Sequence, residues 1–346
     1  MDSSELSALI DAFAGRTVAV IGDVVADEFV YGRVARVSRE APVLILEYDS
    51  TEIVPGAGAN AANNVAALGG RASLVSIVGS DAAGRRMLAA LHPRVMRTAV
   101  ARAAGGTVTK TRILAGGVHS AKQQVVRIDK GVGRAIDART RARFERAALA
   151  SLADADAVLM SDYGSGLVTP ALARRITTAL RQACHPIPVL VDSRYRLLEY
   201  RGLTACTPNE SEVEQALGVR INDNARVLER AGRDILKRTG TQAVLITRGG
   251  RGMALFTSGA DTVHIPIHGS DEIADVTGAG DTVMATMTLA LAAGATFEAA
   301  ARLANYAGGI VVMKRGTATV SRNELRGAVH VSRRSDSAKR SAKADG

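Results

Sequence analysis

The sequence predicts an α/β protein whose mostly parallel central sheet carries helices on both faces, with a small projecting β-lid. Short apolar runs alternate with longer stretches of helical periodicity, and glycines cluster at the ends of the apolar runs. Two regions break this alternation with extra extended segments. Hydrophobic residues make up 47% of the 346 residues and charged residues 23%, so a sizeable core can form.

The alternation gives each predicted element its place. Buried strands are predicted at residues 18–21, 72–78, 157–160, 188–191 and 243–247. Helices are predicted at residues 58–68, 82–91, 138–152, 170–183 and 224–239. A last apolar helical run, at residues 282–297, is too short to span a membrane, so we expect no membrane partner. Ligands of such sheets bind at the carboxyl ends of the strands, and we expect the functional residues there.

The two interrupting regions, at residues 28–54 and 107–130, each contain two extended segments. Because no helices cover both of their faces, we expect them to form a lid over a site or the surface of a homodimer. An ordinary meander at the sheet edge is the alternative. We expect one domain over residues 1–330 and a basic, disordered tail over residues 331–346, which is Ser/Ala-rich and lacks apolar periodicity.

The formal net charge of +10 suits phosphorylated small molecules as well as nucleic acid. Because no zinc, basic-zipper or stacking-aromatic motif accompanies the charge, we expect no nucleic-acid partner. Cys184 and Cys206 lack metal-binding spacing, which predicts two buried thiols in a reducing compartment. The first residues include acidic side chains and no apolar core of the signal-peptide type. These features predict a cytoplasmic protein.

The strongest chemical signal is the segment D-V-T-G-A-G-D, which runs from Asp275 to Asp281 just before the last helical run. Gly278 and Gly280 leave the backbone bare at a helix start, where unpaired N–H groups favour negative charge. A carboxylate at Asp281 could take up a proton while these amides hold developing phosphate charge. The alternative is that Asp281 only caps the helix, and the segment alone leaves both interpretations open.

This segment resembles the C-terminal signature of ribokinase-like (PfkB) carbohydrate kinases, which transfer a phosphoryl group from ATP to a sugar. The resemblance implies that Asp281 is the base that removes the proton from the acceptor hydroxyl. It implies that the amides of Gly278, Ala279 and Gly280 form the anion hole for the transferred phosphoryl group. It also implies Mg²⁺ as cofactor and, near Asp275, a monovalent cation such as K⁺.

Three further landmarks of that family follow in the expected order. The run N-E-S-E matches N-x-x-E, which lies near magnesium and the triphosphate, and its oxygen ligands suit Mg²⁺ held through water. The run T-R-G-G-R-G matches a nucleotide-binding turn, and an asparagine follows where the family flanks the adenine. Alone, each has an ordinary explanation as a helix start or a hairpin, but their order indicates an ATP site. The implied residues are Asn209, Glu212, Thr247, Gly249, Gly252 and Asn305.

The N-terminal part resembles the sugar-binding side of the same family. Asp23 follows the first strand, and its carboxylate, like that of Asp27, can accept two hydroxyl groups. The run G-A-G-A-N resembles the first family signature, in which two glycines are adjacent; here Ala57 replaces one of them, so the turn departs from the pattern. Asn60, Asn63 and Asn64 have capping of the helix as their alternative role. The expected substrate-binding residues here are Asp23, Asp27, Gly56, Gly58 and Asn60.

Four segments resemble D-glycero-β-D-manno-heptose 7-phosphate kinases in particular: residues 37–43, 122–129, 161–166 and 207–212. The resemblance extends from about Thr17 to about Glu324. It implies phosphorylation at O1 to heptose 1,7-bisphosphate, on the route to ADP-heptose, a nucleotide sugar used for lipopolysaccharide core. Some members carry a fused adenylyltransferase. This chain ends shortly after the kinase region and is expected to be the stand-alone kinase.

A substrate that already carries a phosphate needs cations away from the transfer centre. Lys122 and Arg127 lie on a predicted lid strand, and their odd separation sends them to opposite faces unless a bulge intervenes. We expect Lys122 with Gln124 at the pocket, and Arg127 or Arg33 as further candidates. For any single arginine a solvated surface position is the alternative. The segment S-D-Y-G-S-G implies one more substrate-binding residue, Asp162.

Other functions stay open at this point. A ribokinase-like kinase for another sugar, sugar phosphate or nucleoside would show the same motifs. A non-catalytic sugar-binding protein is opposed by the intact Asp281 and N-x-x-E motif. A dinucleotide-binding fingerprint at residues 56–61 does not follow the first strand of a βαβ unit, and the glycine spacing at residues 79–86 lacks the lysine and hydroxyl of a P-loop.

Overall fold

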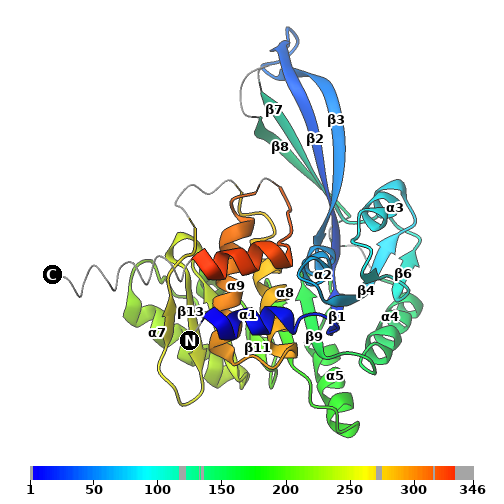
Figure 1. The fold of residues 1–346 in the computed structure, drawn as a ribbon. Coiled ribbons are helices and arrows are strands. Elements are labelled where there is room, and N and C mark those ends of the chain that lie inside the picture. Colours follow the sequence, from blue (N-terminus) through cyan, green and yellow to red (C-terminus); the bar gives the residue numbers. More distant parts are fainter. Residues whose placement is uncertain are drawn as a thin grey trace, which may run out of the picture.

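The computed structural model describes residues 3–116, 122–131, 133, 136–269, 275–314 and 316–331. The expected tail at 331–346 lies, apart from Val331, outside these residues. The core is a ten-stranded sheet in the order β14-β13-β12-β11-β10-β9-β1-β4-β5, with β6 paired to β4 (Figure 1). Its parallel strands are β1 (Thr17–Gly22), β4 (Arg71–Gly79), β5 (Val95–Met96), β6 (Val100–Ala103), β9 (Ala157–Asp162), β10 (Val189–Ser193), β11 (Ala205–Cys206) and β12 (Ala243–Thr247). Antiparallel β13 (Met253–Thr257) and β14 (Val263–Ile265) complete one edge.

Helices cover both faces of this sheet, as predicted. Alternate residues of β1 point to opposite sides: Val18 and Val20 belong to one buried cluster, and Ala19 and Ile21 to another. The first cluster lies against α1 (Ser3–Asp11), α2 (Gly58–Ala67), α3 (Ala82–Ala89), α8 (Ala279–Ala292) and α9 (Phe297–Val311). The second lies against α4 (Ala138–Ala150), α5 (Pro170–Gln182), α6 (Glu210–Leu217) and α7 (Ala225–Thr239). Residues 322–331 are also helical.

The interrupting regions form a separate four-stranded sheet, which stands away from the core in Figure 1. Its strands, in spatial order, are β3 (Leu44–Ala57), β2 (Val24–Val37), β7 (Thr109–Gly116) and β8 (Gln123–Lys130). Because this sheet is distinct from the core sheet, the edge-meander alternative is wrong. We call the four strands the lid.

The lid joins the core at the carboxyl ends of the parallel strands. β1 ends at Gly22 and β2 begins at Val24, so only Asp23 lies between the core strand and the lid strand. β3 ends at Ala57 and runs directly into α2. Both of these crossings between lid and core therefore lie beside the strand ends, where an α/β sheet binds its ligands.

Two sequence-based expectations outside the site can be compared with the structure. Cys206 is buried, but Cys184 is exposed, so the expectation of two buried thiols is wrong for Cys184. It lies in the turn after α5 with a φ of 51°, where the chain turns back at the surface. Among the described residues, no helix has the length and apolar character needed to cross a membrane.

Candidate active site

Asp281 lies in the first turn of α8 and is buried, with 4% of its surface exposed. Its Oδ2 accepts a hydrogen bond from Asn60 Nδ2 at 3.0 Å, and its Oδ1 accepts one from the Tyr163 hydroxyl at 2.9 Å. The helix N-cap is Gly278, so Asp281 is not the cap. Burial raises the pKa of Asp281 to about 7, against the lowering effect of these two donors. A carboxylate with a pKa near 7 is suited to accept a proton at neutral pH.

Asn60 connects α2 to the start of α8. Its Nδ2 also approaches the carbonyl oxygen of Gly278 at 3.4 Å, while its Oδ1 accepts a hydrogen bond from Asn64 at 3.1 Å. The N-cap of α2 is Ala57 and makes no side-chain cap, so these asparagines do not cap the helix. Gly278 has a φ of 79°, and a Cβ there would lie 2.6 Å from Asn60 Nδ2. Glycine is therefore needed to bring Asn60 against the carboxylate of Asp281.

The three amides predicted to form an anion hole differ in their availability. The N–H of Ala279 donates to the carbonyl oxygen of Val276 at 3.2 Å. Within the described chain, the N–H groups of Gly278 and Gly280 have no acceptor. A Cβ on Gly280 would meet no atom within 4 Å, so this residue borders open space at the positive end of the helix.

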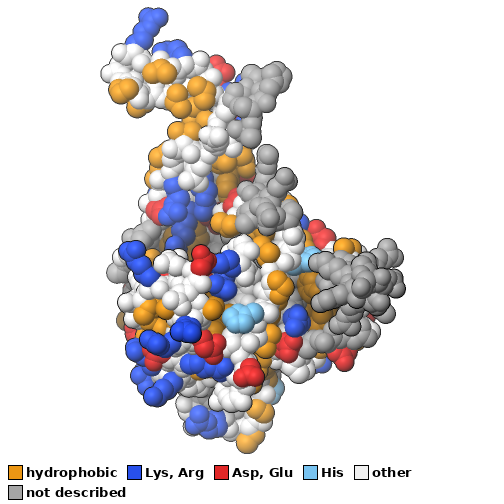
Figure 2. Space-filling model, turned by 90° about the vertical axis from the view of Figure 1, so that its left-hand side faces the viewer, with side chains coloured by type: hydrophobic (Ala, Val, Ile, Leu, Met, Phe, Trp, Pro, Cys, Tyr) orange, Lys and Arg blue, Asp and Glu red, His pale blue; other side chains and the backbone are white. Residues whose placement is uncertain are grey.

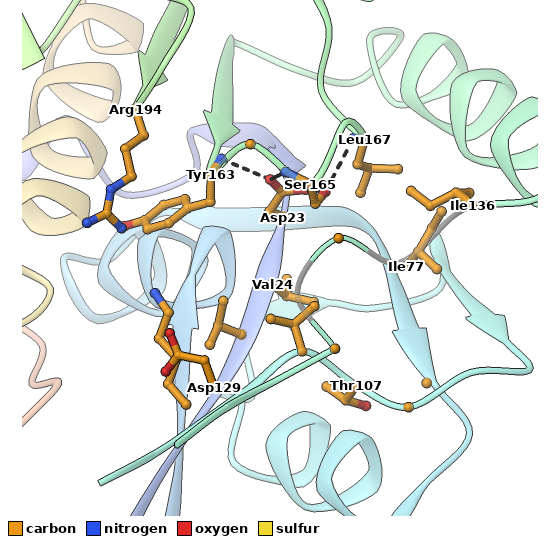
Figure 3. Close-up of a pocket in the computed structure, with 18 of the residues that line it drawn as sticks. Asp23, Val24, Ile77, Thr107, Asp129, Ile136, Tyr163, Ser165, Leu167 and Arg194 are labelled. Atoms are coloured by element: carbon orange, nitrogen blue, oxygen red, sulfur yellow. Dashed lines mark hydrogen bonds between the residues drawn. The ribbon is translucent and has the colours of Figure 1, made fainter. Parts of the chain in front are cut away.

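A pocket of about 270 Å³ lies beside these residues, between the base of the lid and the ends of β1, β9 and β10 (Figure 3). Apolar side chains, among them Val24, Ile77 and Leu167, line one part of it. Its charged lining residues are Asp23, Lys110, Arg127, Asp129 and Arg194. Tyr163 also lines the pocket, and its hydroxyl connects the pocket lining to Asp281.

Tyr163 was not identified from the sequence as a site residue, although its segment was. It follows Asp162 at the carboxyl end of β9, and its ring lies 5.4 Å from Lys110 Nζ. Burial and the nearby Asp281 carboxylate raise the pKa of Tyr163 well above its usual value, so its hydroxyl stays protonated and donates. A neutral residue that gains its role only from a contact 118 residues away in the chain leaves no charge or spacing signal in the sequence.

Asp23 and Asp27 both lie at the base of the lid and are buried. Asp23 accepts hydrogen bonds from the Tyr163 backbone N–H at 2.8 Å and from the Ser165 N–H and hydroxyl. Burial raises the pKa of Asp23 despite these donors. Asp27 forms a 2.5 Å ion pair with Arg112 on the neighbouring strand β7.

The glycines of the first signature allow close packing around these carboxylates. A Cβ on Gly56 would lie 2.2 Å from Asp27 Oδ2, and one on Gly58 would lie 2.9 Å from the carbonyl oxygen of Asp23. Between them, Ala57 has φ 55° and ψ −133°, a conformation that residues with a Cβ rarely adopt. The alanine that departs from the family pattern therefore keeps the turn geometry at a cost in strain.

The structure separates the residues predicted to bind the substrate phosphate. Arg127 lines the pocket, while Lys122 and Gln124 do not. Lys122 pairs with Asp49 at 2.6 Å, and Arg33 pairs with the same Asp49 at 3.0 Å. In β8, Gln124 pairs with Leu114 and Val126 with Ile113, so Val125 forms a bulge between them. The bulge places Gln124 and Arg127 on one face of the lid despite their odd separation.

Asp162 is almost completely buried and lies behind the pocket loop. It accepts hydrogen bonds from the hydroxyls of Ser193 at 2.8 Å and Tyr200 at 2.7 Å, and Arg196 lies 3.3 Å away. These contacts hold the strand ends of β9 and β10 together. Asp162 is not among the residues that line the pocket.

The predicted nucleotide residues gather at the carboxyl ends of β11 and β12. Asn209 caps α6 by accepting from the Glu212 N–H at 2.9 Å, and Glu212 Oε2 accepts from the Asn209 N–H at 2.9 Å. This capping box is the helix-start role considered for the pair, and it uses only the Oε2 atom of Glu212. Asn209 forms a parallel β-bridge with Thr247 at the end of β12.

The glycine turn and Asn305 lie next to each other across β14. Gly249 and Gly252 have φ values of 55° and 77°, and a Cβ on Gly252 would lie 2.1 Å from the Ile265 carbonyl oxygen. Asn305, on α9, donates to the Pro266 carbonyl oxygen at 2.9 Å. The turn and the asparagine therefore border the same short segment after β14.

Carboxylates gather between Asp281 and Glu212. Burial raises the pKa of Asp192 well above its usual value, and the nearby carboxylates of Glu212 and Asp281 add to this effect. Burial also raises the pKa of Glu212, and Arg194 opposes both shifts. Neither Asp192 nor Arg194 was predicted, although Asp192 lies near the carboxyl end of β10 and Arg194 directly follows that strand.

Mutually repelling carboxylates with raised pKa values fit a divalent cation between them. In the described chain no three His, Cys, Asp or Glu side chains are close enough to hold a metal ion directly. Mg²⁺ usually keeps several waters and binds one or two carboxylates together with substrate phosphates, so this donor set fits it. Asp275, proposed beside a monovalent cation, accepts from the N–H groups of Thr277 at 2.8 Å and Gly316 at 3.0 Å.

Comparisons with known proteins show the family to which the chain belongs and the fold that it shares. The family model described as "pfkB family carbohydrate kinase" matches residues 16–324. The chain is 40% identical over 319 residues to the "Bifunctional protein HldE" of Azorhizobium caulinodans, with 90% of this chain and 64% of the relative covered. It is 41% identical over 329 residues to that of Caulobacter vibrioides, with 92% and 65% covered. The chain thus spans slightly less than two thirds of these relatives.

Solved structures of low identity share the fold. Escherichia coli phosphofructokinase-2 in complex with substrates and products has a TM-score of 0.73 at 20% identity, over 92% of this chain and 99% of that one. Arabidopsis thaliana ribokinase complexed with ribose and ATP has a TM-score of 0.67 at 20% identity, over 91% and 99%. The predicted ribokinase-like fold is thereby confirmed, and the chain belongs to the pfkB family of carbohydrate kinases.

Proposed function

We propose that this kinase transfers the γ-phosphoryl group of ATP to O1 of D-glycero-β-D-manno-heptose 7-phosphate. The observation that carries the catalytic part is the environment of Asp281. It is a buried carboxylate with a pKa of about 7, oriented by Asn60 and adjacent to the open amino end of α8. Proton uptake and phosphate stabilisation can therefore occur within one helical turn.

The reaction we propose has one transfer step. The anomeric hydroxyl of the sugar gives its proton to Asp281, and its oxygen forms a bond to the γ-phosphorus. The bond from that phosphorus to the β–γ bridging oxygen breaks, and ADP leaves. The N–H groups of Gly278 and Gly280 point toward the charge that spreads over the phosphoryl oxygens, and positioning supplies much of the remaining acceleration.

The nucleotide is proposed to lie along the ends of β11 and β12, beside Thr247, Gly249, Gly252 and Asn305. Glu212 and Asn209 would hold Mg²⁺ through water, with Asp192 nearby. When bound, the ion neutralises phosphate charge. A K⁺ ion near Asp275 is a further proposal that rests on the family resemblance alone.

The heptose 7-phosphate proposal rests on two supports. The segments at residues 37–43, 122–129, 161–166 and 207–212 resemble kinases of that substrate, and relatives of about 40% identity carry the name HldE. The pocket carries three cationic side chains, which suits an acceptor with its own phosphate. Because the chain spans only part of these relatives, the proposal concerns phosphorylation alone.

The lid also supports the proposal of a homodimer. Figure 2 shows hydrophobic side chains on the surface of the projecting sheet. In the lid, Val126 and Ile128 are each 44% exposed, and Val37 and Tyr48 are more exposed still. Exposed apolar surface on a sheet of this size is typical of an interface. Sedimentation velocity should give twice the chain mass, and Ile128→Asp should shift the protein toward the monomer; a monomeric wild type would exclude this interface.

The substrate proposal can be tested by ADP release across a panel of acceptors. The panel would include heptose 7-phosphate, the free heptose, fructose 6-phosphate, ribose and adenosine. We expect the highest kcat/KM for heptose 7-phosphate, and ³¹P NMR should show the new phosphate on the anomeric oxygen. A higher kcat/KM for another acceptor, or a phosphate elsewhere on the sugar, would reject the substrate assignment and leave the kinase assignment intact.

A further inference from the structure

One face of the lid sheet is unusually rich in charge where it closes the pocket. The register pairs Lys110 with Asp129 and Arg112 with Arg127 across β7 and β8. It also pairs Asp27, on β2, with Lys110. Paired residues of neighbouring strands lie on the same face, so these five side chains share the face that borders the pocket.

The ion pairs described on this face involve two of its three cationic side chains. Asp27 pairs with Arg112 at 2.5 Å, and Asp129 pairs with Arg127 through two hydrogen bonds of 2.7 and 2.6 Å. Within the described residues, Lys110 forms no ion pair, and its ammonium lies over the ring of Tyr163. Burial lowers the pKa of Lys110; the nearby carboxylate of Asp27 opposes this shift, and the guanidinium groups of Arg194, Arg127 and Arg112 add to it.

Arg112 and Arg127 lie directly opposite each other, and like charges in that position destabilise a sheet. Lys110, diagonal to Arg127, adds a third positive charge. Asp27 and Asp129 offset the two guanidinium charges, which leaves one net positive charge on this face that a bound anion would balance. A phosphate monoester carries up to two negative charges at neutral pH and accepts several hydrogen bonds, which matches a lysine beside an arginine fork.

The remaining charges of the pocket lie elsewhere. Asp23 accepts hydrogen bonds from the N–H groups of Tyr163 and Ser165 and from the Ser165 hydroxyl. Arg194 projects from the end of β10 near Tyr163, and it lowers the pKa values of Asp192 and Glu212 (Figure 3). Arg194 therefore lies on the side of the proposed magnesium and triphosphate, while Lys110 and Arg127 lie on the lid.

We propose that Lys110 and Arg127 form a subsite for the phosphate that the acceptor sugar already carries, and that this subsite makes the enzyme prefer sugar phosphates to free sugars. This proposal rests on the proposed sugar-phosphate kinase activity. Arg127 exchanges its Asp129 partner for the phosphate or shares it, and Lys110 supplies the point charge. Because both residues belong to the lid, binding of the substrate phosphate would also hold the lid against the core.

The test compares a phosphorylated and a free acceptor. In Lys110→Met and Arg127→Gln, the ratio of kcat/KM for heptose 7-phosphate to that for the free heptose should fall by about 10- to 100-fold in each case. The KM for ATP should stay unchanged. Arg194→Gln should instead lower kcat with both acceptors and leave the ratio unchanged. Lys130→Met and Arg36→Gln, exposed lid residues outside the pocket, serve as matched controls and should alter neither value.

A second readout does not need turnover. Calorimetry without ATP would compare binding of D-mannose 6-phosphate and D-mannose, with unfolding temperatures confirming that each variant is folded. Phosphate-dependent binding that is lost in Lys110→Met and Arg127→Gln would support the subsite even if heptose 7-phosphate proved to be the wrong substrate. An unchanged ratio in both variants, a raised KM for ATP, or a ratio that responds only to Arg194→Gln would overturn it, even with kinase activity intact.

Discussion

The hydrogen bond from Tyr163 to Asp281 gives a specific prediction for the pH dependence of the reaction. The Tyr163 hydroxyl donates to Asp281 Oδ1 at 2.9 Å and lowers the pKa of this buried carboxylate, which is about 7 in its presence. Tyr163→Phe removes the donor and keeps the ring. The carboxylate then loses one of its two side-chain hydrogen bonds, so its pKa should rise.

The size of the shift follows from the strength of one charge-assisted hydrogen bond. Such a bond to a charged group contributes about 1.5–3 kcal/mol, and about 1.4 kcal/mol corresponds to one pKa unit. Water entering the space left by the hydroxyl would restore part of this stabilisation of the carboxylate, so we expect the pKa of Asp281 to rise by about one unit. The base works when deprotonated, so activity is lost as pH falls through the pKa. The acid limb of kcat/KM should therefore lie near pH 7 in the wild type and about one unit higher in the variant.

The assay is initial-rate ADP release between pH 5.5 and 9.5, with the sugar acceptor varied at saturating ATP. Tyr195→Phe is the control, because Tyr195 lines the same pocket and is 61% exposed. Its acid limb should match the wild type, and the Tyr163→Phe rate should recover at alkaline pH. An acid limb that stays in place, or moves to lower pH, in Tyr163→Phe would refute the assignment of that limb to Asp281.

Three further predictions concern the same helix start and the neighbouring turn. Asp281 has a folded pKa of about 7 against a usual 3.8, so the folded state loses stability as pH rises through that window, by at most about 4 kcal/mol. Asp281→Asn should therefore unfold at a higher temperature than the wild type at pH 8 but not at pH 4. Equal unfolding curves at pH 8 would contradict the raised pKa. Gly280→Ala should keep the wild-type unfolding temperature and lose about tenfold or more in kcat, because its Cβ enters the open space at the helix start. Gly278→Ala should also lose stability, since its Cβ meets Asn60. A fully active Gly280→Ala would contradict the placement of the transferred phosphoryl group at this helix start. Ala57→Gly should stabilise the protein by about 1 kcal/mol, because the strain energy relieved at a φ of 55° exceeds the entropic cost that glycine adds in the unfolded chain. A lower unfolding temperature would show that the turn is not strained.

The sequence predicted the parallel core well and its edges poorly. The strand expected at residues 243–247 has those bounds, and the helix expected at 138–152 ends only two residues earlier, because long periodic runs carry a clear signal. β5 and β11 have two residues each, which is too short for any period. The antiparallel strands β13 and β14 follow the glycine turn, where the alternation of strands and helices no longer guides the prediction.

The site was predictable where a motif is contiguous and not where the fold assembles it. The segment ending at Asp281 predicted a carboxylate beside exposed glycine backbone, and the structure places these residues together at the start of α8. Lys110 lies on β7, while Tyr163 and Arg194 directly follow β9 and β10, and only the strand order brings the three to one pocket. The face of the lid on which Lys122 lies relative to Arg127 is decided by a bulge at Val125, which no sequence periodicity indicates. Contacts between distant strands therefore limited the prediction more than local propensity did.

We propose that Asp281 acts as the base for phosphoryl transfer. The most direct test is single-turnover phosphorylation of a sugar acceptor by Asp281→Asn, with ATP binding measured by calorimetry on the same preparation. Asparagine can keep the contact to Asn60 but cannot accept the proton, so the rate should fall by about 10²–10⁴-fold while ATP binds with wild-type affinity. A rate within about threefold of the wild type would show that another group takes the proton.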